Sequence, residues 1–207
     1  MKPPPVSIGQ QNEGALHRAL KAQLALPGDV FEQSVDGYIV DIVRGDTLIE
    51  VQTGSFSPLR KKLADLVERH DVVLVAPVPV VRTIVRLDDD GAELSRRRSP
   101  KTGRLIEIAD RLVSVTGLMG HPRFTLEVVL THETERRVFA AGRAWRRRGW
   151  VIVGRELDAI AARHVFRGPH DLLSLLPAGL PTPCTTADVA AAARGCGCRA
   201  RARGVAS

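Results

Sequence analysis

A continuous apolar run, Val72–Val78, constrains the fold of this chain more than any other feature of its sequence. The run is bounded by Asp71 and Pro79, and its length suits one strand rather than a helix. A strand that is apolar along its whole length must be covered on both faces, as in parallel sheets reached through a helical crossover. The run therefore predicts an α/β fold in which helices flank a sheet.

The residues before this run predict the other elements of such a fold. Leu16, Leu20 and Leu24 recur at helical spacing, and Ser57 followed by Pro58 is a typical helix start. Between these two helices, apolar stretches separated by turn residues indicate strands. In order, the expected elements are a helix from Asn12 to Leu24, strands at 30–36, Tyr38–Val43 and Thr47–Thr53, a helix from Ser57 to Val67, and the strand Val72–Val78.

Beyond this αβββαβ core, the chain is expected to extend or flank the sheet and then to become helical. Val80–Leu87 and Phe124–Leu130 have the composition of further strands. Helical segments are expected at Glu156–His164 and His170–Leu176. The domain organisation predicted from these patterns is an α/β domain over 1–150 with its core at 12–78, a helical basic C-terminal region at 151–194, and a disordered basic tail at 195–207.

Composition and local patterns indicate a soluble protein. Of its 207 residues, 44% are hydrophobic, enough to bury a core. The N-terminus has no apolar signal stretch, and no run approaches the roughly 18 apolar residues that span a bilayer. All three cysteines lie beyond position 183, so they cannot form a disulfide framework for the body of the chain. We therefore expect a cytoplasmic protein without a membrane partner.

The positive charge of the chain is concentrated in its second half. Thirty Lys and Arg residues against 23 acidic residues give a formal charge of +7, which favours polyanionic partners and makes nucleic acid, DNA in particular, the leading candidate. A solvated arginine face, or the arginine usage of a GC-rich genome, is the alternative. The basic groups are Arg96–Arg98, Arg136 with Arg137, and Arg143 with Arg146–Arg148.

Two acidic residues fall on opposite strands of the expected hairpin. If the hairpin closes through Gly45-Asp46, Asp41 faces Glu50, and like charges so placed are destabilising unless they are neutralised. Gln52 projects on the same face as Glu50 because side chains alternate along a strand. Two carboxylates and an amide oxygen in one place suit a hard divalent cation, Mg²⁺ or Mn²⁺.

A plainer reading of these three residues is also open. Asp41 interrupts the apolar stretch Ile39–Val43, where an unpaired carboxylate costs several kcal/mol. The hairpin could instead have one solvated face that carries Asp41, Glu50 and Gln52, with Arg44 or a lysine of the second helix as their partner. The two readings differ in whether the carboxylates gather around a cation.

The order of elements, together with Asp41 and the later Glu50-Val51-Gln52, resembles the PD-(D/E)XK nuclease superfamily. The resemblance covers about a third of the chain and implies a restriction-endonuclease-like mixed sheet flanked by helices. It also implies that Asp41 and Glu50 hold one or two metal ions that activate water for attack on a phosphodiester bond. By its place on the first helix, Glu13 matches an acid that assists in that family, although an acid is also favoured there by the helix dipole.

The chain departs from the family pattern at Gln52, where a lysine is usual. Glutamine can orient water but supplies no charge, so Lys61 or Lys62 on the following helix is the candidate for the missing positive charge. Two functions follow from the resemblance. One is a metal-dependent endonuclease that acts on DNA, and the alternative is a catalytically inactive nuclease-fold protein with a DNA-binding or regulatory role. Pairing of two copies to cut both strands stays open, as does the DNA structure or sequence cut.

Several other residues have weaker signals. His17 shares a helical face with Glu13, but a lone helical histidine is more often a surface or packing residue, and we do not include it among the catalytic residues. Residues 185–193 resemble the first helix of a helix-turn-helix module, but no recognition helix follows, so either the module is truncated or the resemblance is accidental. Trp145 and Trp150 fit a packed core better than a surface that stacks on nucleic acid. The cysteines Cys184, Cys196 and Cys198 are too few and too tightly spaced for the usual zinc site.

Overall fold

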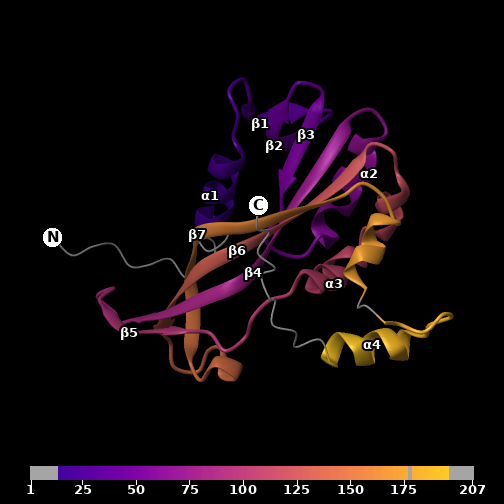
Figure 1. Cartoon of the computed structure of the whole chain (residues 1–207). Coiled ribbons are helices and arrows are strands. Elements are labelled where there is room, and N and C mark those ends of the chain that lie inside the picture. The colour runs from indigo at the N-terminus through magenta and orange to yellow at the C-terminus, as the bar shows by residue number, and fades with distance from the viewer. Residues whose placement is uncertain (1–13, 177–178, 196–207) are drawn as a thin grey trace, which may run out of the picture. The chain divides into compact units, whose positions relative to one another are not determined.

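A seven-stranded mixed sheet forms the main unit of the protein (Figure 1). The structure, a computed structural model, describes residues 14–176 and 179–195, and the chain divides after Pro169 into two compact units. The strands of the first unit follow the order β1-β2-β3-β4-β6-β7, and β5 pairs with β4. Their bounds are β1 Val30–Val35, β2 Tyr38–Arg44, β3 Thr47–Val51, β4 Asp71–Leu87, β5 Glu93–Arg98, β6 Phe124–Phe139 and β7 Trp150–Phe166. The fold is therefore α/β, as the sequence predicts.

The helix, three-strand, helix, strand order expected at the N-terminus is present. Helix α1 (Gly14–Leu24) precedes the antiparallel strands β1, β2 and β3, and helix α2 (Arg60–Val67) leads to β4, which is parallel to β3. The β2–β3 hairpin closes through Gly45 and Asp46, so that Arg44 pairs with Thr47. The proposed cap at Asn12 lies outside the described residues, and Ser57 starts a 3₁₀ turn that leads into α2 rather than capping it.

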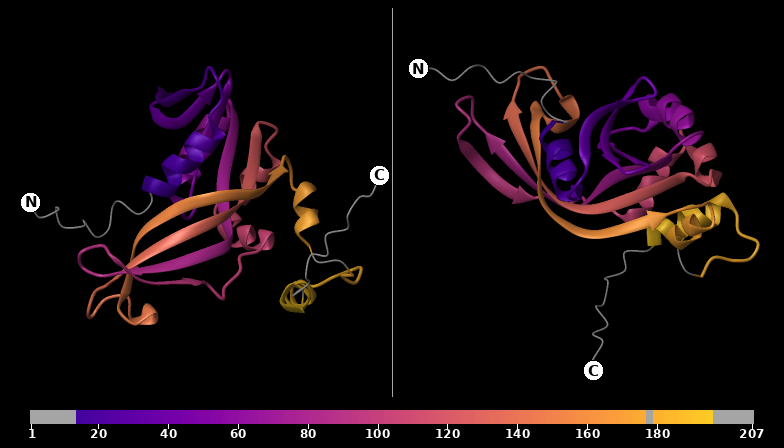
Figure 2. Two further views of the ribbon diagram at one scale, coloured as in Figure 1. Left: turned by 60° about the vertical axis from the view of Figure 1, so that its left-hand side comes forward. Right: turned by 90° about the horizontal axis from the view of Figure 1, so that it is seen from above.

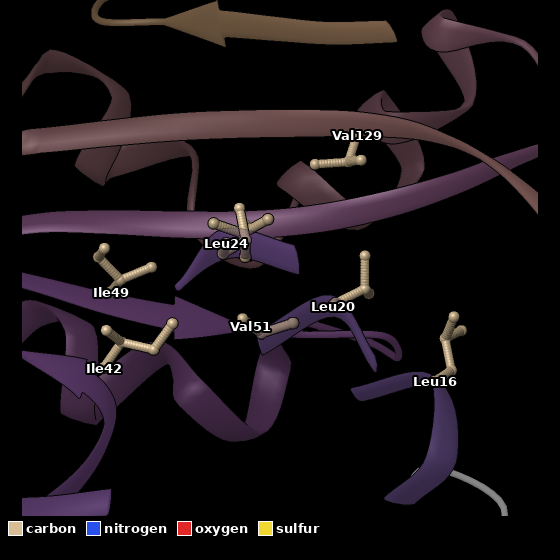
Figure 3. Close-up of a cluster of buried hydrophobic side chains, with 8 residues drawn as sticks. Leu16, Leu20, Leu24, Ile42, Ile49, Val51 and Val129 are labelled. Carbon is tan, nitrogen blue, oxygen red and sulfur yellow. The ribbon is translucent and has the colours of Figure 1, made fainter. Parts of the chain in front are cut away.

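The two faces of the sheet are covered by different helices. The α1 stripe, Leu16, Leu20 and Leu24, packs on Ile42 and Ile49 among other buried side chains of the sheet (Figure 3). On the opposite face, α2 buries its own apolar stripe, which is Leu63, Leu66 and Val67. Because side chains alternate along β3, the residues between its α1-facing positions point toward α2. This alternation brings Glu50 to the α2 side of the sheet.

Strand β4 continues well past the apolar run that predicted it. Val72–Val78 and Val80–Leu87 form one 17-residue strand, with an irregularity in its pairing to β6 between Pro79 and Val81. Prolines are tolerated at such irregularities because the ladder is already interrupted there. Strand β6 likewise runs beyond the predicted Leu130. Figure 2 shows β4, β6 and β7 extending beyond β1–β3 toward β5, so that this part of the sheet lies away from helices α1 and α2.

The helix expected over Glu156–His164 is wrong, since these residues belong to β7. They pair antiparallel with β6 from Phe139↔Trp150 to Leu126↔Phe166. The stretch is rich in Ala, Leu, Glu and Arg, which favour helices, but helix propensity is a weak prior that a long strand partner overrides. The chain from residue 151 to 166 is therefore part of the sheet and not of a helical C-terminal region.

The second unit contains a 3₁₀ turn, Asp171–Leu175, and helix α4, Thr186–Gly195. Thr185 and Asp188 form a reciprocal cap in which each side chain accepts a backbone N–H of the other residue, at 3.2 and 2.7 Å. Cys184 is exposed with a free thiol. Of the tail predicted to be disordered, 195–207, the first residue Gly195 ends α4, and 196–207 lie outside the described residues together with Cys196 and Cys198. No helix in the described parts of either unit is long and apolar enough to cross a bilayer.

Candidate active site

Asp41 lies where strands β2 and β3 move apart. The described β2–β3 ladder ends at Ile42↔Ile49, and the next link is a hydrogen bond from the Val51 N–H to Asp41 Oδ2 (2.9 Å). On the other side of β2, the β1 ladder skips Glu32, whose φ is +51°. The pairing of Asp41 with Glu50 predicted from the turn is therefore replaced by a kink, in which the Asp41 carboxylate bonds to the backbone of β3.

Two basic side chains of α1 hold the Asp41 carboxylate ionised. His17 Nε2 lies 3.0 Å from Asp41 Oδ2, and Lys21 Nζ lies 3.5 Å from Oδ1. Burial acts to raise the pKa of Asp41, but the hydrogen bonds from His17 and the Val51 N–H and the nearby positive charges outweigh it. The pKa of Asp41 is therefore lowered. Lys21 is itself buried and also pairs with Glu32, at 2.9 Å.

Glu50 has the opposite electrostatic character. Its residue is only 3% exposed, and this burial raises the pKa of the carboxyl. The hydrogen bond and charge of Lys62, from α2, oppose the shift, whereas the negative charge of Asp41 adds to it. Lys62 Nζ contacts Glu50 Oε1 as an ion pair, and this buried oxygen has no other partner among the described residues. Two neighbouring carboxyls thus have pKa values displaced in opposite directions.

Gln52 follows Glu50 by two residues and continues the same face of β3 beyond the strand end. Its backbone N–H donates to the Val75 carbonyl (2.8 Å), and its side-chain Nε2 donates to the Ser55 carbonyl (2.6 Å). The amide nitrogen is therefore committed to the protein. Within the part of the chain that the structure describes, no donor to Gln52 Oε1 is present, so this oxygen is the free polar atom of the side chain.

Arg111 contacts the backbone of the segment that follows β3, a role that the sequence did not indicate. Its guanidinium donates to the Gln52 carbonyl and to the Pro77 carbonyl (3.0 Å), and it lies 4.4 Å from the centre of the Phe56 ring. Burial lowers the pKa of Arg111 to about 10. The residue lies between the end of β3 and strand β4 and links their backbones.

The site residues proposed from the sequence can now be placed. The structure brings Asp41, Glu50 and Gln52 to one region and adds Lys62, the second of the two lysines considered. Glu13 lies outside the described residues. His17, which the sequence reading set aside, contacts Asp41 directly. The signal that could have found it was its spacing of four residues from Lys21, because residues so spaced share one helix face.

The donor set of this region suits a magnesium-type cation. Among residues 14–176 and 179–195, no three His, Cys, Asp or Glu side chains are grouped as a metal site. Mg²⁺, however, is commonly held by only one or two carboxylates, with water and substrate phosphates completing its shell. Asp41 and Glu50 supply two such carboxylates, and a cation bound by Glu50 Oε1 would have to displace the Lys62 ammonium that pairs with this oxygen. In the structure, both carboxylates are balanced by lysines.

Comparison with known proteins places the region in a family. The family model described as "Domain of unknown function (DUF8091)" matches residues 14–167, which include the whole sheet. A protein of Treponema pallidum (strain Nichols), described as "Uncharacterized protein", is 32% identical over 195 residues, which are 94% of this chain and 78% of that protein. No solved structure matches the chain.

Proposed function

This chain belongs to the family described as "Domain of unknown function (DUF8091)", and we propose from the geometry of its acidic site that it hydrolyses phosphodiester bonds of DNA with a divalent cation. The observation that carries the proposal is the pair Asp41 and Glu50, two neighbouring carboxyls on adjacent strands with oppositely displaced pKa values. Perturbed carboxyls in one place are characteristic of catalytic sites. A purely structural ion pair does not require two acids together.

The fold proposed for this site is restriction-endonuclease-like. Its support is the order α1, three antiparallel strands, α2 and the parallel strand β4, with the acids on the second and third strands. The separation of β2 and β3 at Asp41 leaves both carboxyls at one end of the hairpin. This arrangement supports the proposed resemblance to PD-(D/E)XK nucleases.

Each residue of the site has a proposed role. Asp41 and Glu50 would hold Mg²⁺ or Mn²⁺, and such an ion when bound lowers the pKa of water and stabilises negative charge on phosphate. The free Oε1 of Gln52 can accept a hydrogen bond from the attacking water and so orient it. Lys62 supplies the positive charge that Gln52 lacks, and His17 keeps Asp41 ionised. Glu13, which lies outside the described residues, is proposed to assist on the strength of the resemblance alone.

The proposed substrate follows from the distribution of arginines. Strand β5 is exposed along its whole length, and it carries Arg96, Arg97 and Arg98. Contacts between such side chains and phosphates provide affinity that does not depend on base sequence and that weakens with salt. DNA binding is therefore expected to be strongly dependent on ionic strength.

One observation favours a second function, that of an inactive nuclease-fold protein that binds DNA. Asp41 is already paired with His17 and Lys21, and Glu50 with Lys62. If these contacts persist in the presence of Mg²⁺, the acids serve to hold helices α1 and α2 on the sheet. The arginines would then carry the function alone.

The test is cleavage of supercoiled plasmid with and without Mg²⁺ or Mn²⁺. We expect metal-dependent cutting by the native chain, and loss of cutting in Asp41→Asn and Glu50→Gln at equal DNA occupancy. Asp46→Asn is the matched control, since this acid is exposed in the hairpin turn. Linear rather than nicked product would indicate that two copies act together. DNA binding without cutting under either metal would establish the second function instead.

A further inference from the structure

The loop between β6 and β7, residues 140–149, has an unusual backbone. Ala144 and Arg148 have φ values of +49° and +52°, a left-handed conformation that is unfavourable for residues other than glycine. Gly149 has a φ of +84°, and a Cβ at this position would lie 2.5 Å from Phe139 Cε2. Backbone strain of this kind is concentrated at functional segments, where the surrounding structure maintains it.

This loop presents Trp145 to solvent. Trp145 is 79% exposed, and the guanidinium carbon of Arg146 lies 5.0 Å from the centre of the indole ring. Trp150 differs, because it packs edge-on against Phe139 at 5.7 Å and under Arg86 at 4.5 Å. The sequence-based expectation that both tryptophans are core residues is therefore wrong for Trp145. A large aromatic side chain held outward on a constrained loop needs an explanation other than packing.

Arginines gather on one face of the strands that lead to this loop. Cross-strand partners share a face of a sheet, and Arg82 pairs with Glu133, Ile84 with Glu135, and Arg86 with Arg137. Glu133 and Glu135 are each 1% exposed and are covered by the arginines around them. This arginine face consists of five arginines against the two glutamates: Arg82, Arg86, Arg97, Arg137 and Arg155.

The positive charge of this face exceeds what its own acids neutralise. Glu135 contacts Arg82 at 3.8 Å, Arg137 at 2.5 Å and Arg155 at 3.6 Å. Arg97, on the neighbouring strand, is exposed and forms no ion pair with any described carboxylate. The buried glutamates hold the guanidinium groups in place, and the remaining charge is available to a polyanion.

We infer that the Trp145 loop is a stacking platform for an unpaired base of DNA whose phosphates lie along the arginine face. The choice of DNA rests on the proposed function. An indole ring can stack with any base, but only a base released from its duplex neighbours can reach it. Guanidinium groups match the geometry of phosphate oxygens. A single exposed tryptophan beside a guanidinium suits one base better than it suits a lipid surface, which favours broad apolar patches.

The test measures binding to an oligothymidine of about 15 nucleotides, a length within the usual range of single-strand sites, in buffer with EDTA so that no cleavage occurs. We expect quenching of tryptophan fluorescence in the native chain. Trp145→Ala should weaken binding between about 5-fold and 150-fold, and Trp145→Phe should weaken it less. Val113→Ala, which removes an apolar side chain that is 74% exposed on another part of the unit, is the matched control. Arg97→Gln should reduce the salt dependence of binding more than Arg60→Gln does.

Three results would overturn the inference. One is unchanged affinity in Trp145→Ala, with thermal unfolding showing that the variant is folded. Another is equal affinity for duplex and oligothymidine with equal dependence on Trp145. The third is a Trp145 emission shift with vesicles of phosphatidylcholine and phosphatidylserine but not with oligothymidine. Because the assay excludes metal, it tests binding separately from cleavage. Loss of cutting in Asp41→Asn with binding to oligothymidine unchanged would support both proposals, whereas binding that depends on Trp145 without any cutting would support this inference alone.

Discussion

At the scale of single residues, Lys62 is the side chain on which the electrostatics of the site most depend. It opposes the effect of burial on the pKa of Glu50. Removing its charge by Lys62→Met should therefore raise the pKa of Glu50 further, so that a higher pH is needed to ionise the carboxyl. We expect the acidic limb of the pH–rate profile for DNA cleavage to move to higher pH, and the rate at neutral pH to fall about 10- to 100-fold, as for other residues that support a metal ligand.

Lys61→Met is the control for this prediction, because Lys61 is the exposed neighbour on the same helix. Its pH–rate profile should match that of the native chain. Equal effects of the two substitutions would mean that Lys62 acts through the general charge of α2 and not through Glu50.

A second prediction at this scale concerns stability at acid pH. Two hydrogen bonds from Arg44, at 2.8 and 2.9 Å, hold the pKa of Asp29 down from 3.8 to about 2. A carboxyl whose pKa is lowered by folding stabilises the protein above its unfolded-state pKa, and this contribution is lost as the pH falls toward the folded value. Between about pH 4 and about pH 2, the native chain should lose more stability than Asp29→Asn does. Urea midpoints at each pH would measure the difference.

Asp46→Asn serves as the control for this measurement as well. Asp29→Asn should flatten the dependence of stability on pH more than Asp46→Asn does. If the curves for the native chain and Asp29→Asn run parallel, the contact between Asp29 and Arg44 does not link folding to protonation.

At the scale of secondary-structure elements, the connection after β5 depends on one close approach of two backbones. The Gly103 N–H donates to the Pro79 carbonyl (3.1 Å), and a Cβ on Gly103 would lie 2.3 Å from that oxygen. Backbone atoms cannot move aside as a flexible side chain can. We therefore expect Gly103→Ala to lower the free energy of unfolding in urea by about 1–3 kcal/mol.

Gly117→Ala is the comparison, since a Cβ there would meet no atom within 4 Å. Its effect should stay within about 0.5 kcal/mol. Similar decreases in the free energy of unfolding for both variants would mean that the effect comes from replacing any glycine, and not from the close contact with Pro79.

The elements that sequence reasoning placed correctly are those whose patterns are local. The α1 stripe, the Gly45-Asp46 turn and the buried run of β4 each have a pattern that one short window contains. Strand β7 has no such pattern, because its residues favour a helix and only their pairing with β6 makes them a strand. The kink at Asp41 was likewise unpredictable, since it depends on the φ of Glu32 in the adjacent strand.

The candidate site shows the same division. Asp41, Glu50 and Gln52 lie on or directly after one hairpin, so turn geometry and alternation predicted their proximity but not the kink that replaces the Asp41–Glu50 pair. His17, Lys62 and Arg111 come from three different helices, and their approach depends on how each helix packs on the sheet. Lysines on α2 could be considered as a class, but the sequence could not choose between Lys61 and Lys62.

At the scale of the whole sheet, strand β3, which carries Glu50, and the connection between β6 and β7, which carries Trp145, lie toward different ends of the long strand β4 (Figure 1). Glu50 pairs with Leu74 of β4. Leu87, thirteen residues further along β4, pairs with Val138, which lies near the end of β6 where the loop begins. At about 3.3 Å per residue this is roughly 40 Å, or the length of about a dozen stacked nucleotides. If both proposals hold, a duplex with a single-stranded tail should be cut in the duplex about a dozen nucleotides from the junction.

Mapping of cut positions on end-labelled substrates would measure this spacing. Moving the junction should move the cut by the same number of nucleotides. Cuts that stay at one sequence, or that scatter without regard to the junction, would mean that the loop does not position the DNA for the site.

The central claim is that Asp41 and Glu50 act as one hydrolytic site. Single-turnover cleavage by the native chain, Asp41→Asn, Glu50→Gln and the double variant, at saturating enzyme with Mg²⁺, tests it most directly. Residues that act as a unit have strongly non-additive effects on rate. We predict that the double variant cuts no more slowly than the slower single variant. Losses that multiply, or cutting that survives both substitutions, would contradict the account.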